Sequence, residues 1–345
     1  MRCILLENIR LQERVGIGTY PTPLEAMPRL SEDLGVRLLV KREDMTGLAM
    51  GGNKTRTLDY LLVQAKKDKA DAVITTCGIQ SNWSRQTVAA AIKLGMKPSL
   101  VLRTAQFKTK PKVLDGNILL DHIMGADIRV VKMGIDEDPE EYLQEQAARL
   151  RKKGFKNPVI LGPKLSSSPP VACAYAECVF EMQKQMEAAG IQIDALVVAN
   201  GSGATQAGIA LGVKILGLKT KVIGVNIGAY ETKKIIGTIL ESSAGASKLF
   251  GTSVELSRSD VEVRDGYDGK GYGIPTKSSD DALRLVARRE GLIIDPVYTA
   301  KTMAFLIDFA KDGEFKGKTV CFMHTGGIPA LFPYRSHFQP SKPIR

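Results

Sequence analysis

A glycine-rich turn followed by a lysine stands out as a possible chemical site. In Gly51-Gly52-Asn53-Lys54 the lysine opens a segment with leucines at 58, 61 and 62, which is helical spacing. The spacing predicts that Lys54 lies at or near the N-terminus of a helix. The helix dipole disfavours a cation there, so a buried Lys54 would act as a neutral amine nucleophile. The alternative is a solvated lysine after a glycine turn.

A second segment has the composition of a phosphate site. It follows the apolar run 195–199 and precedes a helical pattern, and its residues are Gly201, Ser202, Gly203, Ala204 and Thr205. Backbone N–H groups at such a turn, together with the helix dipole, bind an anion. Gln206 stands where a dinucleotide fingerprint needs its third glycine, and no Gly-Lys-Ser/Thr P-loop occurs. One phosphate of a smaller cofactor is therefore expected, the alternative being a plain strand–helix turn.

The third segment is Gln80-Ser81-Asn82, between a predicted strand and a predicted helix. Its hydroxyl and amide groups suit a carboxylate or a phenolate oxygen, although either residue could instead only cap the helix. Trp83, the sole tryptophan, follows it as a core residue or as a cavity wall. A lysine, a phosphate cradle and a Ser-Asn site together match pyridoxal phosphate, because lysine forms a Schiff base with its aldehyde and the ring withdraws electrons from the substrate.

Alternating strand and helix patterns position these segments. The predicted strands are 36–40, 72–76, 98–102, 128–131, 159–161, 195–199, 222–225 and 320–323. The predicted helices are 54–65, 82–94, 117–124, 139–152, 171–189, 205–216, 232–250, 278–290 and 300–311. Such alternation indicates an α/β protein with open parallel sheets flanked by helices, and its two blocks indicate two domains with a cleft between them. The polar segments follow strands, where open parallel sheets bind ligands. The tail after Tyr334 is expected to fray.

Composition excludes several classes of protein. The 345 residues are 44% hydrophobic, no stretch reaches 18 apolar residues, and residues 1–15 lack the apolar core of a signal peptide. Five cysteines without CxxC spacing fit a reducing cytoplasm. The net charge of +11 is scattered and not interleaved with aromatic residues, so no nucleic-acid partner is expected. Three dispersed histidines argue against a metal site, and no Gly-x-Ser-x-Gly elbow supports a hydrolase.

Six ordered motifs carry a family resemblance from about Pro21 to Tyr334. They are Lys41-Arg42-Glu43-Asp44, Gly51-Gly52-Asn53-Lys54-Thr55-Arg56, Gly78-Ile79-Gln80-Ser81-Asn82, Gly271-Tyr272-Gly273-Ile274-Pro275, the run 290–299 ending in Asp295-Pro296-Val297-Tyr298-Thr299, and the run 324–332 beginning His324-Thr325-Gly326-Gly327. The chain resembles the D-cysteine desulfhydrase and 1-aminocyclopropane-1-carboxylate (ACC) deaminase family, which has the tryptophan-synthase-β-like fold and includes L-cysteate sulfo-lyases.

The resemblance implies an architecture and a set of roles. Two open, twisted, mostly parallel sheets would hold pyridoxal phosphate between a large domain (1–50 and 160–345) and a small domain (51–159), in a homodimer. Lys54 would carry the cofactor and move the substrate Cα proton. Ser81 would bind the substrate carboxylate or assist proton transfer, and Asn82 would hold the phenolate oxygen of the ring. The remaining implied site residues are Gly201 to Thr205 for the phosphate, Tyr272 and Tyr298 for the substrate, and Thr299 or Thr325 for the pyridine nitrogen.

The residue at position 299 differs between this chain and the ACC deaminases of the family and bears on the choice of substrate. In ACC deaminases a glutamate follows the Pro-Val-Tyr tyrosine and keeps the pyridine nitrogen protonated, whereas this chain has Thr299. A neutral hydroxyl gives a weaker electron sink, which suffices when the β-substituent leaves readily. We therefore expect α,β-elimination from a small amino acid to pyruvate and ammonia, as in D-cysteine desulfhydrase. L-cysteate sulfo-lyase, ACC deaminase and a racemase or dehydratase remain the alternatives.

The chain also departs from the family pattern near the expected substrate side. Relatives have histidine or glutamine where Trp83 stands, and a Gly-Gly-Ser-Asn segment where this chain has 162–170. The phosphate segment reads Gly-Ser-Gly-Ala-Thr instead of Gly-Ser-Ala-Gly-Thr. Within 162–170, Lys164 is a candidate for binding an anionic side group such as a sulfonate.

Overall fold

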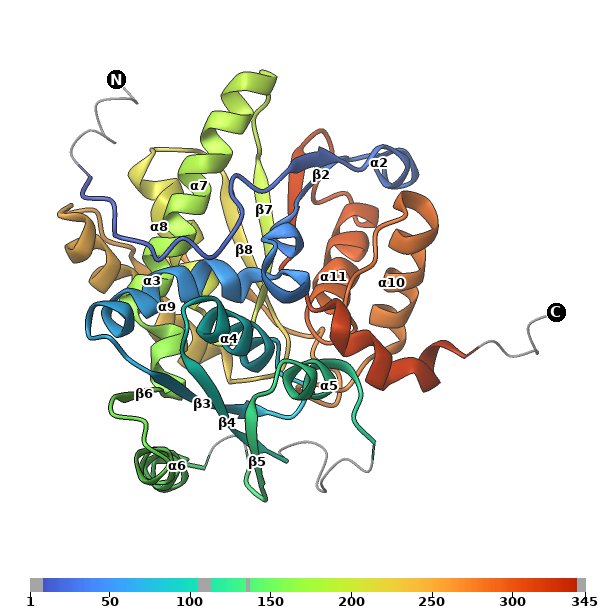
Figure 1. Cartoon of the computed structure of the whole chain (residues 1–345). Helices are drawn as coiled ribbons and strands as arrows, with labels where there is room; N and C mark the ends of the chain where they lie inside the picture. The colour runs from blue at the N-terminus through green and yellow to red at the C-terminus, as the bar shows by residue number, and fades with distance from the viewer. Residues whose placement is uncertain (1–8, 105–112, 135–136, 340–345) are drawn as a thin grey trace.

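The computed structural model describes residues 9–104, 113–134 and 137–339. Two sheets stand side by side in these residues, and helices cover both faces of each sheet (Figure 1). The fold class expected from the sequence is confirmed. No helix in the described residues is long and apolar enough to cross a membrane.

The larger sheet contains six strands. In spatial order they are β1 (Leu24–Ala26), β2 (Arg37–Lys41), β10 (Thr319–Met323), β7 (Ala195–Asn200), β8 (Lys221–Asn226) and β9 (Glu262–Arg264). β1 is antiparallel to β2 and the other pairs are parallel. Residues 195–198 of β7 are all buried because helices cover both faces of the sheet.

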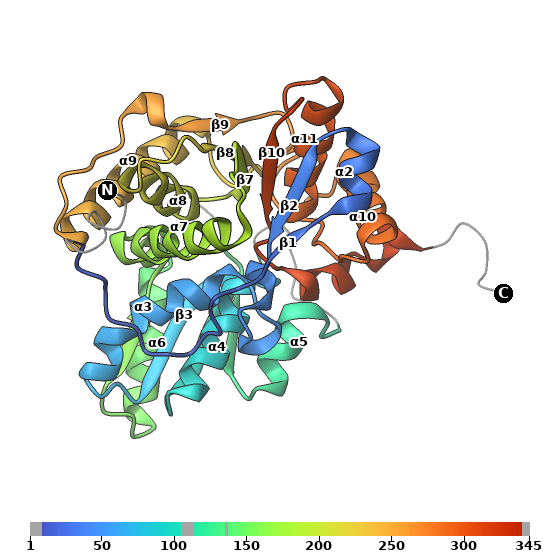
Figure 2. The same cartoon turned by 90° about the horizontal axis from the view of Figure 1, so that it is seen from above.

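Two groups of helices enclose this sheet (Figure 2). On one face lie α7 (Pro169–Ala189), α8 (Ala204–Ile215) and α9 (Thr232–Phe250). On the other lie α2 (Pro28–Leu34), α10 (Lys277–Glu290) and α11 (Thr299–Lys311). The apolar residues between the sheet and each group form two separate cores, which fix the strand ends from which the polar segments emerge.

The smaller sheet contains four parallel strands. In spatial order they are β5 (Asp127–Val131), β4 (Lys97–Arg103), β3 (Ala72–Gly78) and β6 (Pro158–Leu161). Helices α3 (Asn53–Lys67), α4 (Asn82–Lys93) and α5 (Gly116–Ile123) pack on one face, and α6 (Glu140–Lys152) packs on the other. Helix α3 also contacts α7, so it lies between the two sheets (Figure 2).

Short elements account for most differences from the sequence-based prediction. β1 and β9 were not expected, because strands of three residues are too short for an alternating pattern to register. Short 3-10 segments are η1 (Glu43–Met45), η2 (Leu48–Met50), η4 (Pro163–Ser167), η5 (Arg258–Asp260) and η6 (Ile328–Phe338).

The structure also differs from the prediction at the C-terminal tail and at one domain boundary. The expectation that the chain frays after Tyr334 was wrong for 335–338, because η6 continues to Phe338, and residues 340–345 lie outside the described residues. β6 pairs with β3 as far as Leu161, so the smaller sheet extends two residues past the predicted domain boundary at 159. The predicted division into domains otherwise stays a prediction.

Candidate active site

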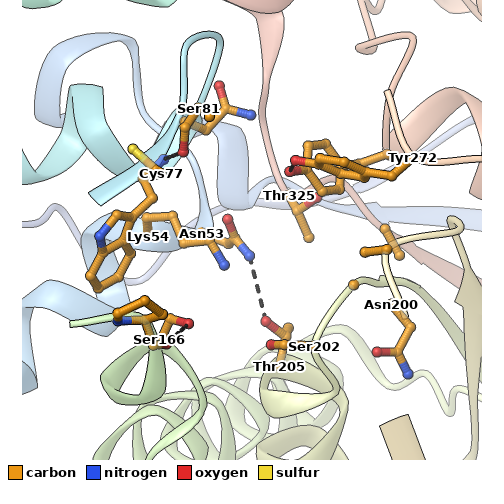
Figure 3. A pocket seen from close by; sticks show the side chains of 18 of the residues that line it. Asn53, Lys54, Cys77, Ser81, Ser166, Asn200, Ser202, Thr205, Tyr272 and Thr325 are labelled. Carbon is orange, nitrogen blue, oxygen red and sulfur yellow. Dashed lines mark hydrogen bonds between the residues drawn. The ribbon is translucent and has the colours of Figure 1, made fainter. Parts of the chain in front are cut away.

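A cavity of about 200 Å³ lies between the two sheets. Its walls come from the end of β4, from segments that follow β3, β6, β7, β8, β9 and β10, and from the starts of α3 and α11. The predicted site residues that line it are Lys54, Ser81, Asn82, Trp83, Gly201, Ser202, Gly203, Thr205, Tyr272, Tyr298 and Thr325. Figure 3 shows Lys54 between Ser81 on one side and Ser202 with Thr205 on the other. The carboxyl ends of strands from both sheets thus meet at one cavity.

Lys54 is the second residue of α3, as the sequence predicted. Gly52 precedes the helix at φ +120°, a backbone conformation that L side chains rarely adopt, and a Cβ there would lie 3.3 Å from the carbonyl oxygen of Thr325. The start of α3 is held against that loop, because Asn53 N donates to the carbonyl of Thr325 at 3.0 Å. Lys54 makes no hydrogen bond to a described residue, and burial lowers the pKa of its ammonium to about 8.

A buried polar network anchors the first turn of α3. Arg56 donates to both carboxylate oxygens of Glu43, at 2.9 and 2.7 Å. The hydroxyl of Tyr175 on α7 donates to the carbonyl of Asn53 and lies within hydrogen-bond distance of Glu43, each at 3.1 Å. All three side chains are at most 2% exposed. Bidentate Arg–carboxylate pairs are geometrically specific, so the network fixes the residues on both sides of Lys54.

The start of α4 forms the opposite wall. Ser81 caps the helix by accepting a hydrogen bond from Trp83 N at 3.1 Å, and it also lines the cavity. The cap is confirmed, and the binding of a carboxylate by Ser81 stays a prediction. The Asn82 side chain is oriented by Asn117, whose Nδ2 donates to Asn82 Oδ1 at 3.0 Å. Trp83 is both a core residue and part of the cavity wall, and its Nε1 donates to Thr75 Oγ1 at 2.8 Å.

The turn after β7 has the geometry of an anion cradle. Gly203 precedes α8 at φ +100°, and a Cβ there would lie 2.9 Å from the carbonyl oxygen of Ile235, so glycine is required. Ala204 is the first residue of α8 and does not line the cavity, whereas Ser202 and Thr205 present hydroxyls to it. Asn53 Nδ2 donates to Thr205 Oγ1 at 3.5 Å across the cavity, which joins the cradle to the helix that carries Lys54 (Figure 3).

Two tyrosines form the third side of the cavity. The hydroxyls of Tyr272 and Tyr298 hydrogen-bond to each other, and their rings meet edge to face with centroids 5.8 Å apart. Burial raises the pKa of Tyr272 to about 12, and burial with the neighbouring Tyr272 raises the pKa of Tyr298 well above its usual value. Both hydroxyls therefore stay protonated near neutral pH and can donate.

The two threonines proposed for the pyridine nitrogen differ in position. Thr325 lines the cavity. Thr299 is fully buried away from the lining, where its hydroxyl donates to Asp295 Oδ1 at 2.6 Å and accepts from Asp295 N at 2.7 Å. Because Asp295 already engages the hydroxyl of Thr299, Thr325 is the one of the two threonines that the fold brings to the cavity.

Lys164 lies outside the cavity, whereas two residues that were not predicted line it. Lys164 is exposed and does not line the cavity, whereas its neighbours Pro163 and Ser166 do. Sequence reasoning missed Arg103 and Tyr230, which also line the cavity. Arg103 directly follows the predicted strand 98–102, and Tyr230 lies in the loop after the predicted strand 222–225, so a place at the carboxyl end of a strand was the available signal.

The lining fits one small anionic cofactor that reacts with an amine. Lys54 supplies a partly buried amine, the turn 201–203 supplies backbone and hydroxyl groups suited to a phosphate, and Asn82 supplies an oriented amide. Among the described lining residues the charged side chains are Lys54 and Arg103, and none is a carboxylate. A neutral to positive cavity of this kind suits an anion.

Comparisons with known proteins agree with this geometry. Residues 15–326 match the family model described as pyridoxal-phosphate dependent enzyme. The chain belongs to this family. As a pyridoxal-phosphate-dependent enzyme it is also similar to a solved structure described as an ACC deaminase homologue, with 36% sequence identity, a TM-score of 0.84 and coverage of 97% of both chains. Pyridoxal phosphate, inferred from the residues, is confirmed as the cofactor of the family.

Proposed function

We propose that the chain is a pyridoxal-phosphate-dependent lyase that removes the β-substituent of a small amino acid, in the manner of D-cysteine desulfhydrase. With D-cysteine, the Cα–H and Cβ–S bonds break, and the electron pair of the Cβ–S bond leaves with sulfur as hydrogen sulfide. Water then hydrolyses the remaining enamine to pyruvate and ammonia. The cofactor supplies the electron-withdrawing ring on which this chemistry depends.

One observation carries the choice of elimination over ring opening. Of the two threonines expected at the pyridine nitrogen, Thr325 lines the cavity, and no described lining residue is an Asp or Glu. A neutral partner leaves the pyridine nitrogen less protonated, which weakens electron withdrawal. A thiol leaves readily from Cβ and needs less withdrawal than the cleavage of a cyclopropane ring.

Named side chains would do the remaining work. Lys54 would hold the cofactor and move the Cα proton, which requires a neutral amine, and its lowered pKa favours that form. Ser81 would donate to the substrate carboxylate, and Asn82 would hold the phenolic oxygen of the ring. Of the paired hydroxyls of Tyr272 and Tyr298, one donates to the other, so a single proton is left to direct at the leaving sulfur.

The decisive assay measures pyruvate release from D-cysteine, L-cysteate, β-chloroalanine, D-serine and ACC by the purified protein with added pyridoxal phosphate. We expect turnover of D-cysteine and β-chloroalanine to exceed turnover of ACC. Turnover of ACC above all the others would overturn the argument from the neutral partner. Lys54→Ala serves as the control, and it should lose both turnover and the visible absorption of the lysine-bound cofactor.

Arg103 favours a second candidate, an L-cysteate sulfo-lyase. Its side chain is 7% exposed and lies on the cavity wall, and its NH1 donates to the carbonyl of Gly134 at 3.5 Å. A guanidinium suits a sulfonate through paired N–H donors, so Arg103 replaces Lys164 as the residue proposed for an anionic β-substituent. Arg103→Met should lower turnover of L-cysteate more than turnover of D-cysteine, and an unchanged ratio would remove this candidate.

The other expectations also stay proposals. A racemase or dehydratase would use the same Cα proton transfer, whereas ACC has no Cα–H bond and would require cleavage of its ring. The substrate panel together with loss of optical rotation distinguishes these alternatives. A homodimer and a cytoplasmic location are inferred from family resemblance and from cysteine usage. Light scattering of the purified protein tests the dimer.

A further inference from the structure

Lys301 is a fully buried lysine that binds backbone and lies outside the cavity lining. It stands in the first turn of α11, and its side chain is 0% exposed. Its ammonium donates to the carbonyl oxygens of Asp268 at 2.7 Å, Gly271 at 3.0 Å and Ile227 at 3.4 Å. An ammonium has three donors, so all of them are directed at main-chain carbonyls. In the described part of the chain, no carboxylate lies within ion-pair distance of it.

These three carbonyls belong to two loops that both form cavity wall. Ile227 follows β8, and the next residues along include Ala229 and Tyr230, which line the cavity. Asp268 and Gly271 belong to the loop between β9 and α10, which also contains the cavity residue Tyr272. The Lys301 ammonium therefore joins two wall segments from outside the cavity.

The two loops touch through their backbones at this point. Gly228 has φ +84°, and a Cβ there would lie 2.9 Å from Asp268 Cβ and 3.1 Å from the carbonyl carbon of Gly271. A side chain at position 228 would therefore clash with the backbone of the neighbouring loop unless the two loops moved apart. Loss of the ammonium would remove one donor from each of the three carbonyls. The carbonyls of Asp268 and Gly271 would keep backbone donors from their own loop, Gly271 N at 3.2 Å and Ile274 N at 3.3 Å, so the link to the loop of Ile227 is what would be lost, which favours separation of the loops.

Burying the ammonium of Lys301 costs free energy, because the charge loses its hydration, and an apolar residue at this position would avoid that cost. Burial lowers the pKa of the Lys301 ammonium to about 8, while the carboxylates of Asp268 and Asp295 act in the opposite direction. A position in the first turn of a helix adds the unfavourable end of the helix dipole. The three hydrogen bonds from the Lys301 ammonium to the carbonyls offset this cost.

We propose that Lys301 is a positioning residue whose ammonium clamps the 227–230 and 266–273 loops together and so holds Tyr272 against Tyr298 at the substrate side of the cavity. The clamp itself follows from contacts within the chain, and its effect on turnover rests on the proposed function. Tyr334 adds a second restraint, since its hydroxyl donates to the carbonyl of Gly273 on the other side of Tyr272.

The test compares Lys301→Met in the holoenzyme with Lys311→Met, which changes an exposed lysine at the end of the same helix. Hydrogen–deuterium exchange of the backbone at 266–273 is the first readout because it needs no substrate. We expect faster exchange in Lys301→Met and unchanged exchange in Lys311→Met. Equal exchange in the wild type and Lys301→Met would refute the clamp.

Steady-state kinetics give the second readout. In Lys301→Met we expect kcat for the preferred substrate to fall about tenfold or more, since small displacements of a reacting group are costly, with a smaller change in KM and full cofactor absorption. Wild-type kcat in this variant would refute the positioning of Tyr272. A wild type that turns over none of the substrates would refute the proposed function, while the exchange readout would still decide the clamp.

Two further variants keep the test decisive if Lys301→Met does not fold. Lys301→Gln retains two N–H donors and should give an intermediate exchange rate. Gly228→Ala separates the same loops without changing any charge and should reproduce the faster exchange at 266–273. A Gly228→Ala protein with wild-type exchange and kcat would contradict the role assigned to the loop contact.

Discussion

The lowered pKa of Lys54 leads to a quantitative prediction about cofactor binding. A Schiff base forms only from the neutral amine, and desolvation in the cavity wall lowers the pKa of the Lys54 ammonium from an ordinary 10.5 to about 8. At pH 7 these values correspond to neutral fractions of about 9% for Lys54 and about 0.03% for an ordinary lysine, a difference of roughly 300-fold. Because burial disfavours the charged form, the neutral fraction of Lys54 levels off above about pH 8.

The assay is the rate at which cofactor-free protein regains visible absorption after mixing with pyridoxal phosphate, measured from about pH 6 to about pH 10. A blocked lysine in solution is run in parallel, so that ionisation of the cofactor itself cancels in the ratio. We expect the protein rate to rise with pH and level off near the Lys54 pKa, while the rate for the blocked lysine keeps rising. The Lys54→Ala variant should lack this phase.

One result would refute the reasoning. If the protein rate still rises about tenfold per pH unit at pH 9, Lys54 titrates like an exposed lysine. The surroundings of Lys54 in the fold would then not be what determines the pKa of its ammonium. The proposed ability of Lys54 to move the Cα proton near neutral pH would lose its physical basis.

Three further predictions concern residues on or near the cavity wall. Gly203→Ala forces a side chain into a conformation at φ +100° beside the carbonyl of Ile235, so calorimetry should show a loss of about 1–3 kcal/mol in stability and a lower Tm. Tyr272→Phe should keep the visible cofactor absorption but lower kcat about 100-fold, and an unchanged kcat would exclude Tyr272 as a proton donor. Lys164→Ala should leave the ratio of turnover on L-cysteate and D-cysteine unchanged, because Lys164 is exposed and outside the lining.

Much of the fold followed from local pattern. Buried parallel strands are continuous apolar runs and amphipathic helices repeat every three to four residues, so the major elements were predicted to within a few residues. β1 and β9 escaped because three residues carry no periodicity, and η6 escaped because its proline-containing sequence resembles a tail. Lys54 at a helix start and Ser81 as a helix cap were both predictable, since capping and turn chemistry are local.

The tertiary structure decided which of the candidate side chains share one space. Thr299 and Thr325 are equivalent as residue types, yet Asp295 satisfies the first and the cavity receives the second. Lys164 and Arg103 are both cations near the substrate side, and only Arg103 lines the wall. Lys301 attracted no notice in the sequence, because its partners are main-chain carbonyls 30 to 74 residues away. The sequence determined the chemistry available to this protein through residue type and local spacing. The packing of two sheets around one cavity determined which of these side chains reach the site, because burial and long-range contacts are properties of the folded chain.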